Sequence, residues 1–190
     1  MKAIILAAGV ARRLAPLTDR TPKCLLPLGD SSLLARMLGA LDDLGVRAAV
    51  VVVGHCAEQV RAAADRWTER EPHKPRFAAG AIGPLNKMLS MSSDVNDPGA
   101  RSVTFDQVYD AYRRQVQALN EGGVHLYLIE TITDTLNAKA CLKAIKDLED
   151  EGLEPLPIWI SGTITDRSGR TLSGQTAEAF WNSVRHAKPF

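Results

Sequence analysis

Short apolar runs alternate along this chain with stretches of helical periodicity. The strand-like runs cover residues 2–9, 48–54, 76–82, 124–132 and 157–164. The helical patterns cover residues 31–45, 56–70, 105–123, 137–151 and 175–186. Because the strand-like runs are apolar on both faces, we expect parallel strands that are covered by helices. The alternation therefore predicts an α/β protein with one five-stranded parallel sheet and flanking helices.

Two strand orders are compatible with this alternation if every crossover is right-handed. The order 3-2-1-4-5 gives a Rossmann-like three-layer arrangement with helices on both faces of the sheet, and it is the preferred prediction. The order 1-2-3-4-5 is that of an open half TIM barrel, because five strands are too few to close an eight-stranded barrel. That alternative leaves one apolar face uncovered, and in that case we expect self-association through the open face.

Composition excludes several classes of partner. The formal net charge is +1 over 190 residues, with no broad basic excess that would indicate a nucleic-acid surface. No apolar run is long enough to span a bilayer, and Met1 leads directly into a strand without a signal peptide. Cys24, Cys56 and Cys141 are odd in number and widely spaced, which favours free thiols over a disulfide framework or a zinc knuckle. We expect a single cytoplasmic domain over residues 1–190, with no nucleic-acid or membrane partner.

The segment after the first strand has features that suit triphosphate binding. Residues 6–27 read LAAGVARRLAPLTDRTPKCLLP. A glycine-bearing turn after a strand lets backbone N–H groups approach a phosphate, and Arg13 can bind phosphate oxygens in a bidentate manner. Lys23 offers a second, mobile positive charge. The same spacing also suits a strand and loop with solvated basic residues.

These residues resemble the N-terminal signature of the sugar-1-phosphate nucleotidyltransferases and the related cytidylyltransferases, L-A-A-G-x-G-x-R-L-x-P-L-T followed by P-K-x-L-L-P. The resemblance implies that Ala8 and Gly9 contact the nucleotide through their backbone. It also implies that Arg13 binds the β- and γ-phosphates and that Lys23 stabilises the α-phosphate, with Mg²⁺ as the metal. Ala11 replaces the second glycine of the pattern, so we expect its methyl group to crowd the phosphate or to forbid a positive φ. The resemblance ends near residue 59, before the family's metal carboxylate.

From about residue 64 onward the sequence resembles the homocysteine-binding barrel of cobalamin-dependent methionine synthase. The matching stretches include ADRWTEREPHKPRF, AGAIGPLNKMLSMSSDVNDP, LIETITDTLNAKA and ISGTITDRSGRTLSGQTAEAFWNSVRHA. The resemblance implies that Glu130 holds the amino group of homocysteine and that Asn86 and Thr131 line the same site. The position of Glu130 at the end of a strand-like run points to the same site without the resemblance, since a carboxylate at the carboxyl end of a parallel strand is a common site position. A solvent-facing Glu130 is the alternative.

That family activates the substrate thiol on zinc and takes the methyl group from cobalamin. Its three zinc cysteines are expected beyond residue 190, and Cys141 lies in a helical pattern that cannot replace them. We therefore expect no metal site and no cofactor, neither Mg²⁺ with a nucleoside triphosphate nor zinc and cobalamin. Whether the chain is an enzyme stays open, and we expect it to be inactive.

Both resemblances meet inside one helical pattern. Val60, Ala63, Ala64 and Trp67 form an uninterrupted apolar stripe across residues 56–70. The leading hypothesis is an engineered or recombined chimera, with residues 1–60 derived from a nucleotidyltransferase and residues 61–190 from a methionine synthase barrel. Such a chimera would have no evolved catalytic activity. The alternatives are residual nucleoside-triphosphate binding or nucleotidyl transfer, and metal-free binding of homocysteine.

Overall fold

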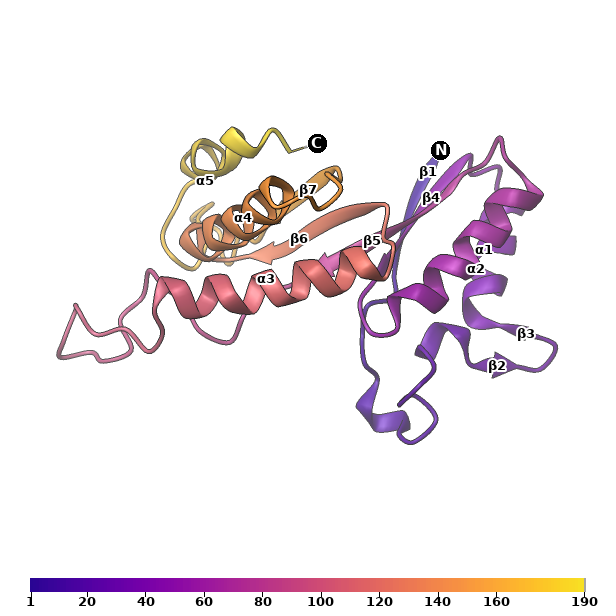
Figure 1. The fold of residues 1–190 in the computed structure, drawn as a ribbon, viewed down its shortest axis with the longest axis horizontal. Coiled ribbons are helices and arrows are strands. Elements are labelled where there is room, and N and C mark those ends of the chain that lie inside the picture. Colours follow the sequence, from indigo (N-terminus) through magenta and orange to yellow (C-terminus); the bar gives the residue numbers. More distant parts are fainter. Residues whose placement is uncertain (190) are drawn as a thin grey trace. The chain divides into compact units, whose positions relative to one another are not determined.

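The computed structural model describes residues 1–189 and contains the alternation of strands and helices that the sequence predicts (Figure 1). The sheet strands are β1 (Lys2–Leu6), β4 (Ala48–Val53), β5 (Arg76–Ile82), β6 (Leu126–Ile132) and β7 (Ile158–Gly162). The α-helices are α1 (Leu33–Asp43), α2 (Ala57–Arg70), α3 (Phe105–Glu121), α4 (Thr135–Asp150) and α5 (Ala177–Val184). None of these helices has the length and apolar character that a bilayer crossing requires.

Smaller elements complete the fold. Short 3-10 helices are η1 (Arg12–Leu14), η2 (Lys23–Leu25) and η3 (Arg185–Ala187). The strands β2 (Pro27–Leu28) and β3 (Ser31–Ser32) form an antiparallel hairpin that the apolar pattern did not predict, because each strand has only two residues.

The strand order of the sheet is β1-β4-β5-β6-β7, with parallel pairing of β1 with β4, β4 with β5, and β6 with β7. This confirms the α/β class and the five-stranded sheet. Numbered along the chain, the order is 1-2-3-4-5. It is the order of the half-barrel alternative, and the preferred order 3-2-1-4-5 is wrong.

The reason for the error lies in how little apolar surface the sequential order exposes. The argument for 3-2-1-4-5 assumed that the apolar strands would lie open to water without a second helical layer. Instead, Val51, Val52 and Val53 of β4 are at most 1% exposed, and residues 126–129 of β6 are all buried. The most exposed apolar side chains of the sheet are on β1, where Ile4 is 60% and Leu6 is 77% exposed. Phe77 of β5 is 39% exposed, and the apolar residues 158–160 of β7 are half-buried. The sequential order therefore leaves its largest apolar exposure on β1 and smaller exposure on β5 and β7.

The described chain forms two compact units. Unit 1 comprises Met1–Ala81 and Glu121–Leu126, and unit 2 comprises Ile82–Asn120 together with the chain from Tyr127 onward. The boundary follows the end of β5. The single-domain assignment and the division by origin at residues 60 and 61 both stay predictions.

In unit 1, helices α1 and α2 lie side by side. Ser32 begins α1, because its hydroxyl accepts a hydrogen bond from Ala35 N at 3.2 Å. Gly45 follows the helix with a φ of +69°, a left-handed conformation that glycine adopts without strain. Helix α2 runs without interruption through the position where the two sequence resemblances meet, and Val60 and Ala64 on its apolar stripe are completely buried. The single helix predicted over residues 56–70 is confirmed.

A polar network also holds α2 in unit 1. The Nδ1 atom of His125 accepts a hydrogen bond from Ala78 N at 2.9 Å, and its Nε2 atom lies 3.5 Å from a carboxylate oxygen of Asp65. Arg61 donates to Asp65 Oδ2 at 3.1 Å and to Gly123 O at 3.2 Å. The network connects the helix to β5 and to the segment that precedes β6.

In unit 2, α3 packs with α4, and α5 lies next to α4 (Figure 1). Thr104 and Gln107 form a reciprocal capping box at the start of α3, with hydrogen bonds of 3.3 Å and 3.0 Å. Tyr109 donates its hydroxyl to Asp147 Oδ2 at 2.7 Å, which joins α3 to α4. The core of unit 2 includes Tyr112 and Ile129, both completely buried.

Candidate functional site

The first candidate site is the loop that follows β1 in unit 1, residues 7–26. Ala11 adopts φ +53° and ψ +44°, so the residue that replaces the second glycine of the signature takes a left-handed conformation. For an L-residue this conformation costs about 1 kcal/mol relative to glycine. The buried Thr18 hydroxyl donates to Ala11 O at 3.1 Å. The expectation that a methyl group forbids a positive φ here is wrong, because the loop holds the turn in place.

Two side chains that follow β4 anchor the same loop. His55 Nε2 lies 3.0 Å from Thr18 O, and because a carbonyl oxygen only accepts, Nε2 carries the proton. Gln59 in the first turn of α2 donates to Arg20 O at 2.8 Å. The sequence interpretation missed both residues. The small G-H-C turn at the carboxyl end of the β4 strand was the signal that could have identified them.

The predicted nucleotide-binding residues all belong to unit 1. Ala8 lies against Gly54, where a Cβ atom would be only 2.9 Å from Ala8 O. Gly9 is exposed, Arg13 is an exposed residue of η1, and Lys23 is the exposed first residue of η2. Within residues 1–189, the side chains of Arg13 and Lys23 form no hydrogen bond or ion pair, and no contact brings the two together. Their charges are available to an anion but do not form a closed site.

The second candidate site is at the carboxyl end of β6 in unit 2. Pairing between β6 and β7 is irregular between Ile129 and Ile132. Thr131 has a φ of +59°, which a β-branched residue rarely adopts and which costs about 1–3 kcal/mol. Glu130 is half-buried, and Asn86 and Thr131 are exposed. The carboxylate of Glu130 makes no hydrogen bond or ion pair within the described residues, so no contact brings it together with Asn86.

Two residues that the sequence interpretation missed organise this end of unit 2. Asp134, only 2% exposed, accepts hydrogen bonds from Ser90 N at 2.8 Å, from Ser90 Oγ at 2.7 Å and from Leu136 N at 2.9 Å. Asn137 accepts from Leu89 N at 3.0 Å. Both side chains fasten the long 83–104 loop to the start of α4. An Asp directly before a helical pattern is an N-cap signal, and it could have indicated Asp134.

The segment after β7 is fastened to the same β6–α4 connection. Thr133 O accepts hydrogen bonds from Ser173 N at 3.2 Å and from Ser173 Oγ at 2.9 Å. Thr135 donates its hydroxyl to Gln175 Oε1 at 2.6 Å. Two loops therefore meet at the carboxyl ends of β6 and β7, the side on which parallel sheets bind ligands.

The three cysteines do not suit thiolate chemistry on a metal. Cys24 and Cys141 are buried, and Cys56 is half-buried at the start of α2. Burial raises the pKa of all three thiols, and the nearby Glu58 further raises the pKa of Cys56. Among residues 1–189, no group of three His, Cys, Asp or Glu side chains is arranged to hold a metal ion. The residues present do not fit a zinc site.

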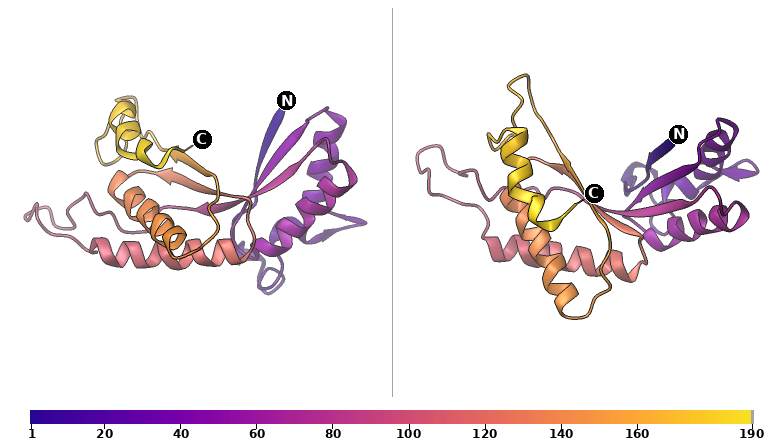
Figure 2. Two further views of the ribbon diagram at one scale, coloured as in Figure 1. Left: turned by 45° about the horizontal axis from the view of Figure 1, so that its top comes forward. Right: turned by 90° about the horizontal axis from the view of Figure 1, so that it is seen from above.

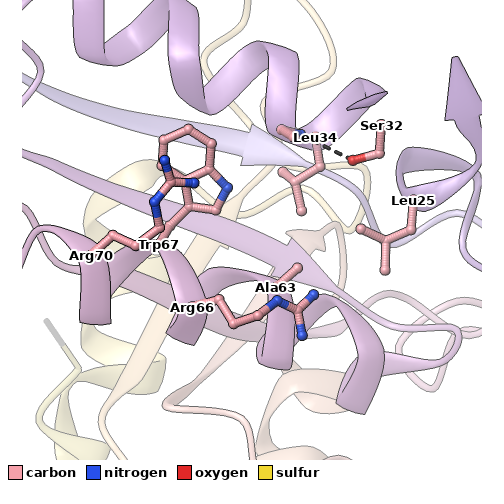
Figure 3. Close-up of a pocket in the computed structure, with 8 residues that line it drawn as sticks. Leu25, Ser32, Leu34, Ala63, Arg66, Trp67 and Arg70 are labelled. Atoms are coloured by element: carbon pink, nitrogen blue, oxygen red, sulfur yellow. Dashed lines mark hydrogen bonds between the residues drawn. The ribbon is translucent and has the colours of Figure 1, made fainter. Parts of the chain in front are cut away.

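Two cavities lie away from the predicted site residues. One, of about 240 Å³, lies between η2, α1 and α2 in unit 1 (Figure 3). The guanidinium of Arg70 stacks over the Trp67 ring at 5.1 Å beside it. The residues that line this 240 Å³ cavity are Leu25, Ser32, Leu34, Ala35, Ala63, Arg66, Trp67 and Arg70. The other, of about 770 Å³, lies in unit 2 between α4, residues 156–158 and residues 186–188.

The sequential parallel sheet, with loops tied together at its carboxyl ends, defines an α/β protein of the barrel-related type. The sequence model of the homocysteine S-methyltransferase family matches residues 37–190. The chain therefore belongs to the homocysteine S-methyltransferase family. The match begins inside α1, upstream of the predicted start of the methyltransferase-like part at about residue 64.

Solved structures agree with this fold. The apo homocysteine methyltransferase MmuM from Escherichia coli is 15% identical with a TM-score of 0.62, and the match covers 98% of this chain and 68% of MmuM. Its metallated form is 15% identical with a TM-score of 0.57, covering 97% and 70% of the two chains. The cytidylyltransferase LicC from Streptococcus pneumoniae is 26% identical over 60% of this chain and 40% of LicC, with a TM-score of 0.35. The MmuM matches show the fold alone, and the LicC match is too weak for a structural argument.

Proposed function

We propose that this chain is a chimera that retains the fold of the homocysteine S-methyltransferase family without an evolved catalytic activity. In this proposal residues 1–60 derive from a nucleotidyltransferase, and residues 61–190 derive from a barrel like that of cobalamin-dependent methionine synthase. The observation that carries the proposal is that the family match begins at residue 37 and so leaves the nucleotidyltransferase-like signature of residues 6–27 outside it. Cys141 is completely buried in α4, and burial raises its pKa, so this thiol does not serve as a metal-binding thiolate.

The cavity between η2, α1 and α2 lies at the join, which is the part of unit 1 where the two sequence resemblances meet. This cavity supports the proposed two-part origin. Leu25, Leu34 and Ala35 come from the first part, whereas Ala63 and Trp67 come from the second. A solvent-open hollow of about 240 Å³ between these helices is expected if their side chains were not selected together. We propose no cofactor for the chain and a cytoplasmic location, which its three free cysteines support.

The experiment is a thermal-shift measurement with two groups of ligands. One group contains nucleoside triphosphates with Mg²⁺, and the other contains homocysteine with and without Zn²⁺. A ligand that binds only the folded state at 100 times its Kd stabilises that state by about 2.7 kcal/mol, which gives a measurable shift. We expect no shift and no transfer of a nucleotidyl or methyl group. Steady turnover of either kind would overturn the proposal.

Residual nucleoside-triphosphate binding is the first alternative, and the left-handed Ala11 favours it. The turn has the conformation that a second glycine would give, and Thr18 fastens it at 3.1 Å. If this alternative holds, a triphosphate stabilises the chain, and Arg13→Ala and Lys23→Ala each abolish the shift. Arg47→Ala, which removes an exposed cation outside this loop, is the matched control and keeps the shift.

Metal-free homocysteine binding is the second alternative, and the strained Thr131 favours it. Backbone strain concentrates at ligand sites, and this residue adjoins the unpaired Glu130 carboxylate. In that case homocysteine alone raises the melting temperature, and Glu130→Gln removes the effect. The exposed Glu154→Gln is the control, because its side chain lies outside the β6 end.

A further inference from the structure

The cavity of about 240 Å³ between η2, α1 and α2 in unit 1, the α1–α2 cavity, has an apolar wall (Figure 3). Both helices, drawn in purple in Figure 2, contribute side chains to it. Leu34 and Ala63 in this wall are buried. Leu25 and Ala35 are half-buried. In Figure 3 the half-buried Trp67 ring lies at one end of the cavity and Leu25 at the other, so an apolar ring can pack between them.

Two arginines of α2 line the same cavity without a carboxylate partner. Arg66 and Arg70 are exposed and four residues apart, so they lie on one side of the helix. Within residues 1–189 neither forms an ion pair or a hydrogen bond, and the guanidinium of Arg70 lies over the Trp67 ring at 5.1 Å. Like charges at this spacing repel, whereas Arg61 and Asp65 on the same helix pair at 3.1 Å. An anion bound by both guanidinium groups removes this repulsion.

The volume of the α1–α2 cavity limits the size of a ligand. An apolar cavity of about 150 Å³ can hold a benzene ring. Pockets for drug-sized molecules measure about 300–1,000 Å³. At about 240 Å³ the α1–α2 cavity lies between the two, with room for one ring and a short polar arm. From the apolar wall and the two unpaired guanidinium groups, we propose that this cavity binds a single-ring aromatic carboxylate, for which phenylacetate is the probe.

Each part of such a ligand has a partner in the cavity. The ring packs against Leu34, Ala63 and the Trp67 ring. The carboxylate accepts hydrogen bonds from Arg66 and Arg70, because a guanidinium presents its N–H groups in a planar fork that matches carboxylate oxygens. A cationic ligand is repelled by the same two side chains. A neutral ring leaves their mutual repulsion in place, so charge selects the carboxylate.

Exposure of the two arginines sets the expected strength. Water screens their attraction for a carboxylate, and an exposed ion pair changes an affinity by only about two- to fivefold. The ligand itself has few atoms with which to make contacts. We therefore expect a Kd on the order of 0.1–1 mM for phenylacetate. Binding of a carboxylate here goes beyond the proposed function and does not depend on it.

The test is an NMR titration of the full ¹⁵N-labelled chain with phenylacetate. The indole N–H signal of Trp67, assigned by its absence in Trp67→Phe, is expected to move in a saturable manner. The signals of Trp159 and Trp181, which do not line the cavity, are the internal references and stay in place. Phenylacetamide, which keeps the ring but has no charge, is expected to bind about tenfold more weakly, because it loses both ion pairs. Acetate, which has the charge but no ring, is expected not to move the Trp67 signal.

Variants of the chain separate the two parts of the site. Arg66→Gln and Arg70→Gln are each expected to weaken phenylacetate binding about two- to fivefold and to leave phenylacetamide binding unchanged. Arg47→Gln, at an exposed cation outside the cavity, is the matched control and changes neither. Ala35→Leu places side-chain volume in the cavity and is expected to abolish binding while the chain stays folded.

Three results overturn the proposal. The first is a Trp67 signal that does not move at about 20 mM phenylacetate, a concentration well above the expected Kd. The second is equal binding of phenylacetate and phenylacetamide, because the guanidinium groups then have no part in it. The third is phenylacetate binding that persists in the folded Ala35→Leu variant, because the ligand then lies elsewhere.

Discussion

Three glycines of unit 1 allow a test of how space and backbone conformation determine stability. Gly39 lies in the middle of α1, and a Cβ atom there would have Trp67 Cη2 as its nearest neighbour at 4.0 Å, an ordinary contact. Glycine in a helix interior is less favourable than alanine by about 0.8–1.0 kcal/mol. Gly39→Ala is therefore expected to stabilise unit 1 by about 1 kcal/mol, which raises the melting temperature by roughly 2–4 °C.

The other two glycines are matched controls with opposite expectations. At Gly54 a Cβ atom would lie 2.9 Å from Ala8 O and 3.3 Å from Ala8 Cβ, so Gly54→Ala must displace backbone and is expected to cost about 1–3 kcal/mol. At Gly45 there is open space around a Cβ, but the φ of +69° makes Gly45→Ala unfavourable by about 1 kcal/mol. The first loss is steric, and the second is conformational.

Urea denaturation followed by far-UV circular dichroism measures all three changes as shifts of the transition midpoint at constant m-value. The expected order of stability is Gly39→Ala, then the unchanged chain, then Gly45→Ala, then Gly54→Ala. If Gly39→Ala lowers the midpoint, the packing of α1 against Trp67 described above is wrong. If Gly54→Ala is neutral, the loop after β1 does not lie against the end of β4.

Three further predictions concern unit 2 and the join. Burial raises the pKa of Tyr112 to about 12, and its hydroxyl has no hydrogen-bond partner among residues 1–189. The unfolded chain therefore loses this proton at lower pH than the folded chain, so stability falls as pH rises from 10 toward 12, by about 1.4 kcal/mol per pH unit. Tyr112→Phe should remove this pH dependence of the unfolding free energy, which urea denaturation between pH 9 and 12 measures. An unchanged dependence on pH in the variant would contradict the prediction. Asp134→Ala leaves the partners of three hydrogen bonds unpaired and is expected to cost about 2–4 kcal/mol and to expose the 83–104 loop to limited proteolysis. The exposed Asp166→Ala is its control, and equal protease resistance of the two variants would refute the role of Asp134. Ala35→Leu places side-chain volume in the cavity at the join and is expected to raise the urea midpoint by the equivalent of about 0.5–2 kcal/mol, whereas a decrease would mean that the cavity cannot accept it.

Much of the fold follows from local sequence patterns. The five strand-like runs and five helical stripes all form, because hydrophobic periodicity reports which face of each element is buried. The start of α3 at Thr104 and the stop after α1 at Gly45 follow from local backbone chemistry. The family of the larger part was also evident from long runs such as LIETITDTLNAKA, and the family match confirms it at the level of homocysteine S-methyltransferases.

The candidate sites were only partly predictable, because their organisation depends on contacts between distant residues. Gly9, Arg13 and Lys23 could be named from a contiguous signature. The side chains that hold their loop, His55 and Gln59, come from beyond the next strand. In the same way Glu130 could be named, but the hydrogen bonds of Asp134 to Ser90 span 44 residues.

The sequence alone determined the α/β class, the element boundaries to within a few residues and the continuity of α2 across the join, since each depends on interactions between near neighbours in the chain. Only the tertiary structure decided the strand order, the left-handed turns at Ala11 and Thr131, and the exposure of Ile4. The physical reason is that an apolar strand indicates that it will be buried but not which strand lies beside it. That choice depends on the total surface left uncovered, and in the sequential order the most exposed apolar side chains of the sheet lie on β1.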